Sequence, residues 1–153
     1  MKLFNNIEQE KKDLMKYRLK GIEPLLVVAG LIEKDGKYLI AQRKRGDDLV
    51  VGKWEFPGGK VKEGEEEKTA IEREMREEFK LNIEADKYVC NVIYEYPTRT
   101  INLKLWHGNV LDKVFDMDES DHLAYKWVSL DEINDFELCP ADKELYQKIK
   151  LKN

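Results

Sequence analysis

One stretch constrains the fold of this chain more than any other, residues 58–81, which read GGKVKEGEEEKTAIEREMREEFKL. Apolar residues recur in it at the spacing of one helical face, which predicts a helix from about Glu65 to Phe79. The apolar positions are Ala70, Ile71, Met75 and Phe79. The segment therefore predicts an amphipathic helix that buries one stripe and leaves a second face to polar side chains.

That second face carries a cluster of acids, Glu74, Glu77 and Glu78. Carboxylates three or four residues apart on a helix repel one another, at a cost of roughly 0.2–0.5 kcal/mol for each exposed pair. A divalent cation bound among them would relieve this repulsion. Because all the ligands would be oxygen atoms, the cluster favours magnesium, with manganese as an alternative, over zinc.

A loop with two glycines, Pro57–Lys60, comes before this helix. Glycine has no side chain to hold a ligand away, so the backbone amides and carbonyls of such a loop can contact a bound molecule directly. We therefore expect the loop to contribute backbone contacts next to the acidic face.

The spacing of these residues resembles the Nudix box, the signature of hydrolases that cleave nucleoside diphosphates linked to another moiety. The match consists of Gly59, Glu65, the run Arg73–Glu78 and Leu81. The stretch Trp54–Lys60, WEFPGGK, is also similar to that of the MutT-like subgroup, which hydrolyses nucleoside triphosphates. The alternative is a solvated glutamate-rich helix in a chain that is 38% charged, and the fixed spacing of glycine, arginine and acids argues against it.

One position departs from the family pattern, because Lys80 stands where the family usually has glycine. Glycine at that point suits a left-handed helix end, and a lysine in the same conformation would cost on the order of 1 kcal/mol. The departure concerns the end of the helix and leaves the acid cluster unchanged.

The resemblance implies an α/β fold, the Nudix fold, in which a mixed β-sheet lies between helices as an α/β/α sandwich. It covers roughly residues 24–150. We expect residues 1–20 to form an extra N-terminal helical segment, with a disordered segment as the alternative because of its charge, and residues 21–153 to form the Nudix hydrolase domain. A chain of 153 residues is long enough for one domain with a proper core and short for two.

The rest of the chain alternates short apolar runs with turn residues. We expect strands at residues 25–32, 38–41, 54–57, 83–95, 100–110 and 122–128. Asp35-Gly36 predicts a hairpin turn between the first two strands. Ser129 and Glu132 form a capping box that predicts a helix start, and Pro140 opens a final helix that runs to about residue 151.

Several apolar residues of these elements are expected in the core. They are Leu103, Leu105 and Trp106 in the second half of the chain and Leu145 and Ile149 in the final helix. The alternative for the first three is a wall on which a base stacks. His122, beside the last expected strand, is interpreted as a surface or hydrogen-bonded residue and not as part of the site.

The reaction that the resemblance implies is hydrolysis of a nucleoside triphosphate to the monophosphate and pyrophosphate. Magnesium would be held by Glu74, Glu77 and Glu78, with a backbone carbonyl of Gly58 as a further ligand. Two alternatives remain open, cleavage of a nucleotide sugar or dinucleotide at the same metal site, and a catalytically silent nucleotide-sensing domain.

Further residues of the site follow from the same resemblance. Arg43 and Lys60 would bind the substrate phosphates, and for Arg43 the alternative is a solvent-facing arginine at the end of a strand. Arg73 would orient the metal-binding carboxylates by ion pairing. Glu65 would support the site without contacting the substrate.

Members of the family differ in the acid that activates the attacking water. Some use a glutamate of the box, which here would be Glu77 or Glu74, and others use an acidic residue in the loop before the last strand. Asp121 occupies that second position. Its neighbours Asp118 and Glu119 are alternatives, and a purely solvated acidic loop is another.

The segment Leu138–Asp142, LCPAD, resembles the place where related enzymes position a base-reading side chain. An ionised Asp142 only accepts hydrogen bonds, so it suits an exocyclic amine such as N4 of cytosine. The alternative is that Asp142 serves the helix N-terminus, where a carboxylate is favoured by about 0.3–1 kcal/mol. A buried, protonated Asp142 could also read oxidised guanine. We expect a preference for cytosine triphosphates.

Composition excludes several classes of partner. The 27 basic and 31 acidic residues give a net charge of −4, so no overall field attracts nucleic acid polymers or an anionic membrane. The N-terminus lacks an apolar signal core, and no stretch approaches the roughly twenty apolar residues of a membrane span. Cys90 and Cys139 fit no metal or redox spacing and are expected to be reduced. We expect a cytoplasmic monomer or homodimer that acts on a small nucleotide.

Overall fold

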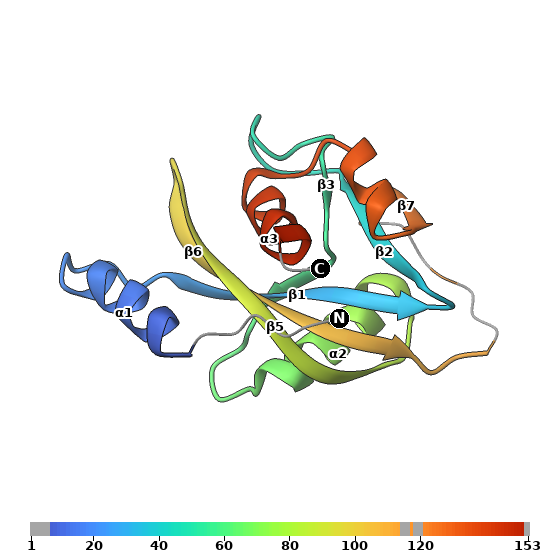
Figure 1. Cartoon of the computed structure of the whole chain (residues 1–153), viewed down its shortest axis with the longest axis horizontal. Coiled ribbons are helices and arrows are strands. Elements are labelled where there is room, and N and C mark those ends of the chain that lie inside the picture. The colour runs from blue at the N-terminus through green and yellow to red at the C-terminus, as the bar shows by residue number, and fades with distance from the viewer. Residues whose placement is uncertain (1–6, 114–116, 118–120, 152–153) are drawn as a thin grey trace.

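The computed structural model describes residues 7–113, 117 and 121–151, which form a mixed sheet with helices on both faces (Figure 1). The helices are α1 (Ile7–Arg18), α2 (Glu67–Phe79), the 3-10 helix η1 (Asp131–Asp135) and α3 (Pro140–Leu151). The strands are β1 (Leu25–Lys34), β2 (Lys37–Arg43), β3 (Trp54–Glu55), β4 (Gly58–Lys60), β5 (Ile83–Tyr96), β6 (Arg99–Val110) and β7 (His122–Val128). Helices α2 and α3 lie on opposite sides of β1, which confirms the predicted α/β class and its sandwich.

Strand β1 lies in the middle of the sheet. It pairs in parallel with β6, from Leu25 opposite Ile101 to Glu33 opposite Asn109, and antiparallel with β2 and β4. Residues 28–32 of β1 are buried, as expected of a strand that is covered on both faces. The sheet is completed by β5 beside β6, and by β3 and β7 beside β2.

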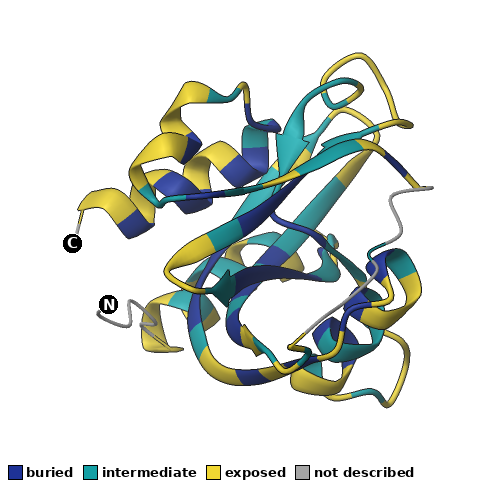
Figure 2. Ribbon diagram, turned by 90° about the vertical axis from the view of Figure 1, so that its right-hand side faces the viewer, coloured by how far each residue is buried: buried dark blue, intermediate teal, exposed yellow. Residues whose placement is uncertain are grey.

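Two hydrophobic cores fill the space between the sheet and its helices. The four apolar residues predicted for the acidic helix are buried against Val28, Ile32 and Leu39, which confirms the predicted stripe. On the other face, Leu145 and Ile149 of α3 are buried with Leu103 and Leu105 of β6, as predicted. Figure 2 shows the result as helices with a buried face toward the strands and an exposed face outside.

The glycine loop before α2 contains a short strand, β4, where the sequence indicated only a loop. Gly58 and its neighbours pair with β1, and a Cβ on Gly58 would lie 1.9 Å from the carbonyl oxygen of Val28. Only glycine lets the two backbones approach this closely. Gly58 therefore permits β4 to pair with β1. This pairing fixes the loop to the middle of the sheet.

Helix α2 begins at Glu67, later than the predicted start at Glu65. Residue Glu65 lies outside the helix because its carboxylate accepts a hydrogen bond from the backbone N–H of Lys62 and pairs with Arg73. At the other end, Lys80 adopts the left-handed conformation, with φ 54° and ψ 36°, and its N–H donates to the carbonyl of Arg76. Lysine thus takes the conformation that glycine would adopt with less strain.

The capping box predicted at Ser129 and Glu132 is present, since each side chain accepts a hydrogen bond from the other residue's backbone N–H. The helix that it starts is a single short 3-10 helix, η1, and not an α-helix. Both cysteines, Cys90 and Cys139, are buried free thiols. Among the described residues, no helix has the length and apolar character needed to span a membrane.

Helix α1 forms within the predicted N-terminal segment and has no buried residue. The hydroxyl of Tyr88 on β5 donates to the carboxylate of Glu10 at 2.6 Å, which attaches α1 to the edge of the sheet. The boundary between a segment at residues 1–20 and a domain at residues 21–153 stays a prediction.

Candidate active site

Arg73 is the centre of an ion-pair network on the side of α2 that faces the glycine loop. Its Nε and Nη2 donate to both oxygens of Glu65, at 2.7 and 2.9 Å. Its Nη1 donates to Glu74 at 2.9 Å and to Glu77 at 3.0 Å. Its Nη2 also donates to the backbone carbonyl of Lys60, which ties the loop to the helix. The prediction that Arg73 orients the carboxylates of this helix by ion pairing is confirmed.

The same network sets the charge of Glu65. Hydrogen bonds from the Arg73 guanidinium, followed by the backbone N–H of Lys62, lower the pKa of Glu65 to about 2. Glu65 is therefore ionised at neutral pH and fixes Arg73 in place, which is the supporting role expected for it.

Glu78 lies in a contrasting environment. Burial raises its pKa to about 9, and the neighbouring carboxylates of Glu55, Glu74 and Asp121 add to the rise. Its Oε2 is buried without a hydrogen-bond partner among the described residues. A buried carboxylate oxygen that lacks a partner and faces other acids fits a site for a cation, because a bound positive charge would favour the ionised form.

The predicted metal ligands do not form a closed cluster within residues 7–113, 117 and 121–151. Glu74 and Glu77 contact Arg73, whereas Glu78 lines a pocket together with Gly58. A Cβ on Gly59 would lie 2.4 Å from the carboxyl carbon of Glu74, so the glycine loop packs directly on this acid. The candidate metal ligands beside the loop are all carboxylate or carbonyl oxygen atoms, which suits magnesium or manganese.

Two pockets adjoin each other beside Gly58. The smaller, of about 280 Å³, is polar, and its lining includes Glu78, Asp121, His122 and the basic run Arg43–Arg45. The larger, of about 450 Å³, is lined mainly by apolar side chains such as Val27, Phe56, Ile101 and Leu103, with Asp142 among them. Both pockets include Arg43, Glu55 and Gly58. A ligand with an anionic part and an apolar ring would fit across the two.

Arg43 stands on the wall that the two pockets share. Its Nη1 donates to Oε1 of Glu55 at 3.1 Å, and its Nε donates to the backbone carbonyl of Arg45 at 3.1 Å. The guanidinium is thus held by two acceptors at the mouth of a polar pocket, with its side chain 37% exposed, and its role in binding phosphate stays a prediction.

Asp142, in the first turn of α3, is only 6% exposed. The backbone N–H of Phe56 donates to its Oδ2 at 2.9 Å. Burial raises the pKa of Asp142 well above its ordinary value, and the nearby carboxylate of Glu55 adds to the rise. Of the alternatives that the sequence left open, burial favours the protonated Asp142, which donates as well as accepts hydrogen bonds, and its role in reading the base stays a prediction.

Sequence reasoning missed Glu55 and left His122 outside the site. Nε2 of His122 lies 3.2 Å from Oε2 of Glu55, and its ring stacks on Phe79 with 5.0 Å between centroids. Glu55 was present in the WEFPGGK stretch, and that signal could have found it. His122 is different, because it reaches the site only through the pairing of β2 with β7, in which it lies opposite Arg43.

The profile of one known family, described as NUDIX domain, matches residues 27–148 of this chain. The chain belongs to the Nudix hydrolase family. It is 40% identical over 121 residues to the CTP pyrophosphohydrolase of Escherichia coli (strain K12), which covers 79% of this chain and 87% of that protein. It is 28% identical over 134 residues to the 8-oxo-dGTP diphosphatase of the same strain, which covers 84% of this chain and 98% of that protein.

Solved structures support the same assignment. The solution structure of the E. coli ORF135 protein matches with a TM-score of 0.73 and 35% identity, over 86% of this chain and 92% of that chain. The crystal structure of the MutT protein from Methanosarcina mazei Go1 matches with a TM-score of 0.72 and 29% identity, over 85% of this chain and 96% of that chain. This Nudix hydrolase is therefore MutT-like, as its sequence predicted.

Two predicted site residues of this Nudix hydrolase lie at the edge of the pockets. Asp121 lines the smaller pocket with its side chain 52% exposed, and it lies 3.9 Å from Arg45. Lys60 is exposed at the end of β4 and is not among the described residues that line either pocket. The alternatives Asp118 and Glu119 lie outside the described residues.

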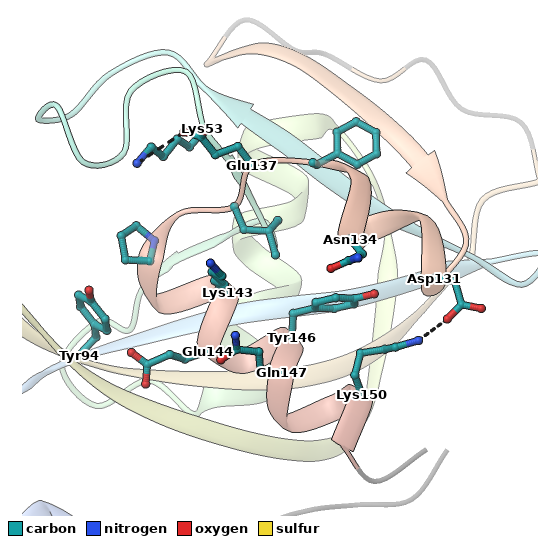
Figure 3. A pocket seen from close by; sticks show the side chains of 13 residues that line it. Lys53, Tyr94, Asp131, Asn134, Glu137, Lys143, Glu144, Tyr146, Gln147 and Lys150 are labelled. Atoms are coloured by element: carbon teal, nitrogen blue, oxygen red, sulfur yellow. Dashed lines mark hydrogen bonds and ion pairs between the residues drawn. The ribbon is translucent and has the colours of Figure 1, made fainter.

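A wider groove, of about 990 Å³, lies on the outer side of α3 (Figure 3). Ion pairs between Lys53 and Glu137 and between Lys150 and Asp131 border it. None of the described residues that line this groove is a predicted site residue of the Nudix hydrolase. Its size alone therefore does not make it the active site.

Proposed function

We propose that this Nudix hydrolase cleaves a nucleoside triphosphate to the monophosphate and pyrophosphate, with magnesium as its cofactor and a cytosine triphosphate as its preferred substrate. The observation that carries the proposal is the pair of adjoining pockets, one polar and acid-lined and one mainly apolar, which share Arg43 and Glu55. The phosphates would occupy the polar pocket and the base the apolar one.

Glu74, Glu77, Glu78 and the backbone carbonyl of Gly58 would hold the magnesium, with manganese as an alternative. The bound cation would supply charge neutralisation on the phosphate oxygens, which is the main requirement of phosphoryl transfer. The protein's own contribution is to keep these acids in place, and the Arg73 network does this for Glu74 and Glu77.

Arg43 would bind a substrate phosphate in the polar pocket, because a guanidinium matches phosphate oxygens in geometry and charge. Lys60, exposed at the end of β4, would assist from the rim. Because these two cations come from separate elements, they would hold the phosphate chain at two points.

Asp121 would accept the proton of the attacking water. It lines the polar pocket near Glu78, and a general base of this kind contributes typically about 100-fold or more to the rate. Asp121→Asn should therefore lower kcat about 100-fold with little change in magnesium affinity. If kcat stays unchanged, the base is a glutamate of the box, Glu77 or Glu74.

Asp142 would read the base. As a neutral acid it offers a donor beside an acceptor, and N3 and N4 of cytosine offer an acceptor beside a donor. On its N7 edge, unmodified guanine presents two acceptors at N7 and O6, which match a carboxylic acid poorly. Oxidation of guanine places a proton on N7, so 8-oxo-dGTP stays a second candidate substrate. The similarity to a CTP pyrophosphohydrolase and to an 8-oxo-dGTP diphosphatase supports this pair of candidates.

We place the reaction in the cytoplasm, where thiols such as Cys90 and Cys139 stay reduced and free nucleotides are available. The partner is a small nucleotide and not a nucleic acid polymer or membrane. The protein would act as a monomer or homodimer.

A substrate screen tests the proposal. CTP, dCTP, dGTP, dATP, 8-oxo-dGTP, a nucleotide sugar and a dinucleotide would each be incubated with and without magnesium, with pyrophosphate and orthophosphate scored separately. We expect magnesium-dependent release of pyrophosphate, with the highest kcat/KM for a cytosine triphosphate. Cleavage of only the sugar or dinucleotide would reassign the substrate class. Binding without turnover of any nucleotide would identify a sensor.

A further inference from the structure

His122 is the first residue of β7, and it is buried beside the polar pocket. It is 7% exposed, and its ring stacks on Phe79 of α2 with an angle of 17° between the planes. In the sheet it lies opposite Arg43 of β2. Its backbone and its ring are therefore both held, and the ring can move little.

A chain of hydrogen bonds connects His122 to the proposed phosphate-binding arginine. Nε2 of His122 lies 3.2 Å from Oε2 of Glu55, and the other oxygen of Glu55 accepts from Nη1 of Arg43 at 3.1 Å. The side chain of Glu55 is only 14% exposed, so it is anchored between these two donors away from bulk water. The three residues come from three different strands and line the polar pocket, and Arg43 and Glu55 also line the larger one.

The surroundings of the imidazole favour one tautomer. Nε2 of His122 faces a carboxylate oxygen of Glu55, which accepts hydrogen bonds, so Nε2 is the nitrogen that has an acceptor for its proton. Nδ1 is buried and has no hydrogen-bond partner among the described residues. A proton on Nδ1 would therefore be a buried donor without an acceptor. The tautomer with its proton on Nε2 is the one that fits.

We propose that His122 is a positioning residue, which anchors Glu55 so that Glu55 fixes the orientation of the Arg43 guanidinium for a substrate phosphate. Neither of the two hydrogen bonds that Arg43 donates to described residues uses its Nη2, and we assign this donor to the phosphate. Without His122, one oxygen of Glu55 loses its donor, and the carboxylate can rotate and take Nη1 of Arg43 with it. The inference rests on the proposed role of Arg43 in substrate binding.

The first test uses variants that keep the shape of the site. His122→Phe preserves the ring on Phe79 but removes the donor, and His122→Gln restores a donor of similar reach. We expect His122→Phe to raise KM roughly tenfold, as for loss of one hydrogen bond to a charged group, with a smaller change in kcat and none in magnesium affinity. His122→Gln should recover most of the loss. Tyr125→Phe, which changes another neighbour of Phe79, is the matched control and should leave KM unchanged.

A double-mutant cycle separates positioning from a purely structural role. If His122 acts through Arg43, then His122→Phe should have no further effect on KM in an Arg43→Ala background. Equal losses in both backgrounds, or no recovery with His122→Gln, would overturn the proposal.

The second test does not depend on turnover. Nitrogen-15 chemical shifts of the two histidines, assigned with His122→Phe, report which ring nitrogen of His122 carries the proton at neutral pH. We expect the Nε2 tautomer in the wild type and a mixture of tautomers in Glu55→Ala. A proton on Nδ1 in the wild type would overturn the positioning role. A wild-type protein that hydrolyses no nucleotide would instead refute the proposed function. The chemical shifts would still show whether His122 donates a hydrogen bond to Glu55.

Discussion

Two groups of acids lie near the same glycine loop, and the pKa values of Glu65 and Glu78, one from each group, are shifted in opposite directions. Glu65, Glu74 and Glu77 are held by the guanidinium of Arg73, which lowers the pKa of Glu65 to about 2. Glu78 and Asp142 lie on the inner side of the site, where burial raises the pKa of both. Glutamate and aspartate have similar intrinsic acidity, so the difference comes from partner and burial and not from residue type.

The comparison assigns the two groups different tasks. The guanidinium of Arg73 offsets the mutual repulsion of the acids that it binds. These acids can therefore stay ionised and close together, and they hold the loop and the helix in place. Acids that are buried near one another resist ionisation, so they favour a ligand that brings either a positive charge or a matching hydrogen-bond pattern. The predictions below alter one group at a time.

The largest effect is expected from Glu77→Gln, which changes the group held by Arg73 at a proposed metal ligand. The substitution should lower kcat at least 100-fold, a loss of about 3 kcal/mol in transition-state stabilisation, because a ligand carboxylate is removed. The fold should persist, since the side chain of Glu77 is 56% exposed. Steady-state kinetics and a thermal melt measure both. Glu66→Gln, which changes an exposed residue near the start of the same helix, is the control and should keep wild-type activity. If Glu77→Gln keeps activity within tenfold of wild type, Glu77 is not a metal ligand.

Asp142→Asn tests the buried group and should act on specificity. An amide presents its donor and acceptor in fixed positions, so we expect the ratio of kcat/KM between dCTP and 8-oxo-dGTP to change roughly tenfold or more. Glu144→Gln, on the exposed side of α3, should leave the ratio unchanged. An unchanged ranking of dCTP, dGTP, dATP and 8-oxo-dGTP in Asp142→Asn would mean that Asp142 only serves the helix N-terminus.

The same variant gives a pH signature. Because the folded-state pKa of Asp142 is raised above the ordinary value of 3.8, its contribution to stability is fully present below that pH and is lost as the pH rises. Asp142→Asn has no carboxyl group that ionises at this position, so it does not lose this stability as the pH rises. The Tm of the variant relative to wild type should therefore increase from pH 4 to pH 8.

Glu65→Gln should show the opposite pH slope with a smaller effect. The depressed pKa of Glu65 means that its stabilisation is present above its ordinary value of 4.5 and is lost as the pH falls toward 2. We expect the variant to melt roughly 2–4 °C below wild type at pH 7, with the gap closing as the pH falls. Glu63→Gln, exposed in the same loop, should track wild type at every pH. A gap that is constant with pH would contradict the assigned ion pair with Arg73.

The smallest effect is expected from Lys80→Gly, which changes the end of α2 and none of the acids in the two groups. Glycine relieves the left-handed strain, so the protein should gain on the order of 1 kcal/mol and melt about 2–4 °C higher. Activity and both pH slopes should stay as in wild type. Lys62→Gly is the control, and a drop in Tm for Lys80→Gly would show that the lysine side chain contributes contacts that outweigh the strain.

Much of the acidic helix could be predicted from local sequence. Its buried stripe and the ion pairing of Arg73 with Glu74 and Glu77 follow from spacing along a helix, whereas the left-handed end at Lys80 was indicated only by the glycine that the family usually has there. Interactions of this range are determined by residues a few positions apart, and no knowledge of the sheet is needed. The Nudix family and its α/β fold could be predicted from the same stretch.

The rest depended on pairing between distant strands. The contacts of Glu55 with His122 and with the donating Arg43 join residues of β3, β7 and β2, and the order of strands in the sheet is what brings them together. The raised pKa of Asp142 was also decided by the tertiary structure. A sequence shows that a residue is acidic, but only the packed fold determines how much water and which charges surround it, and these set its pKa.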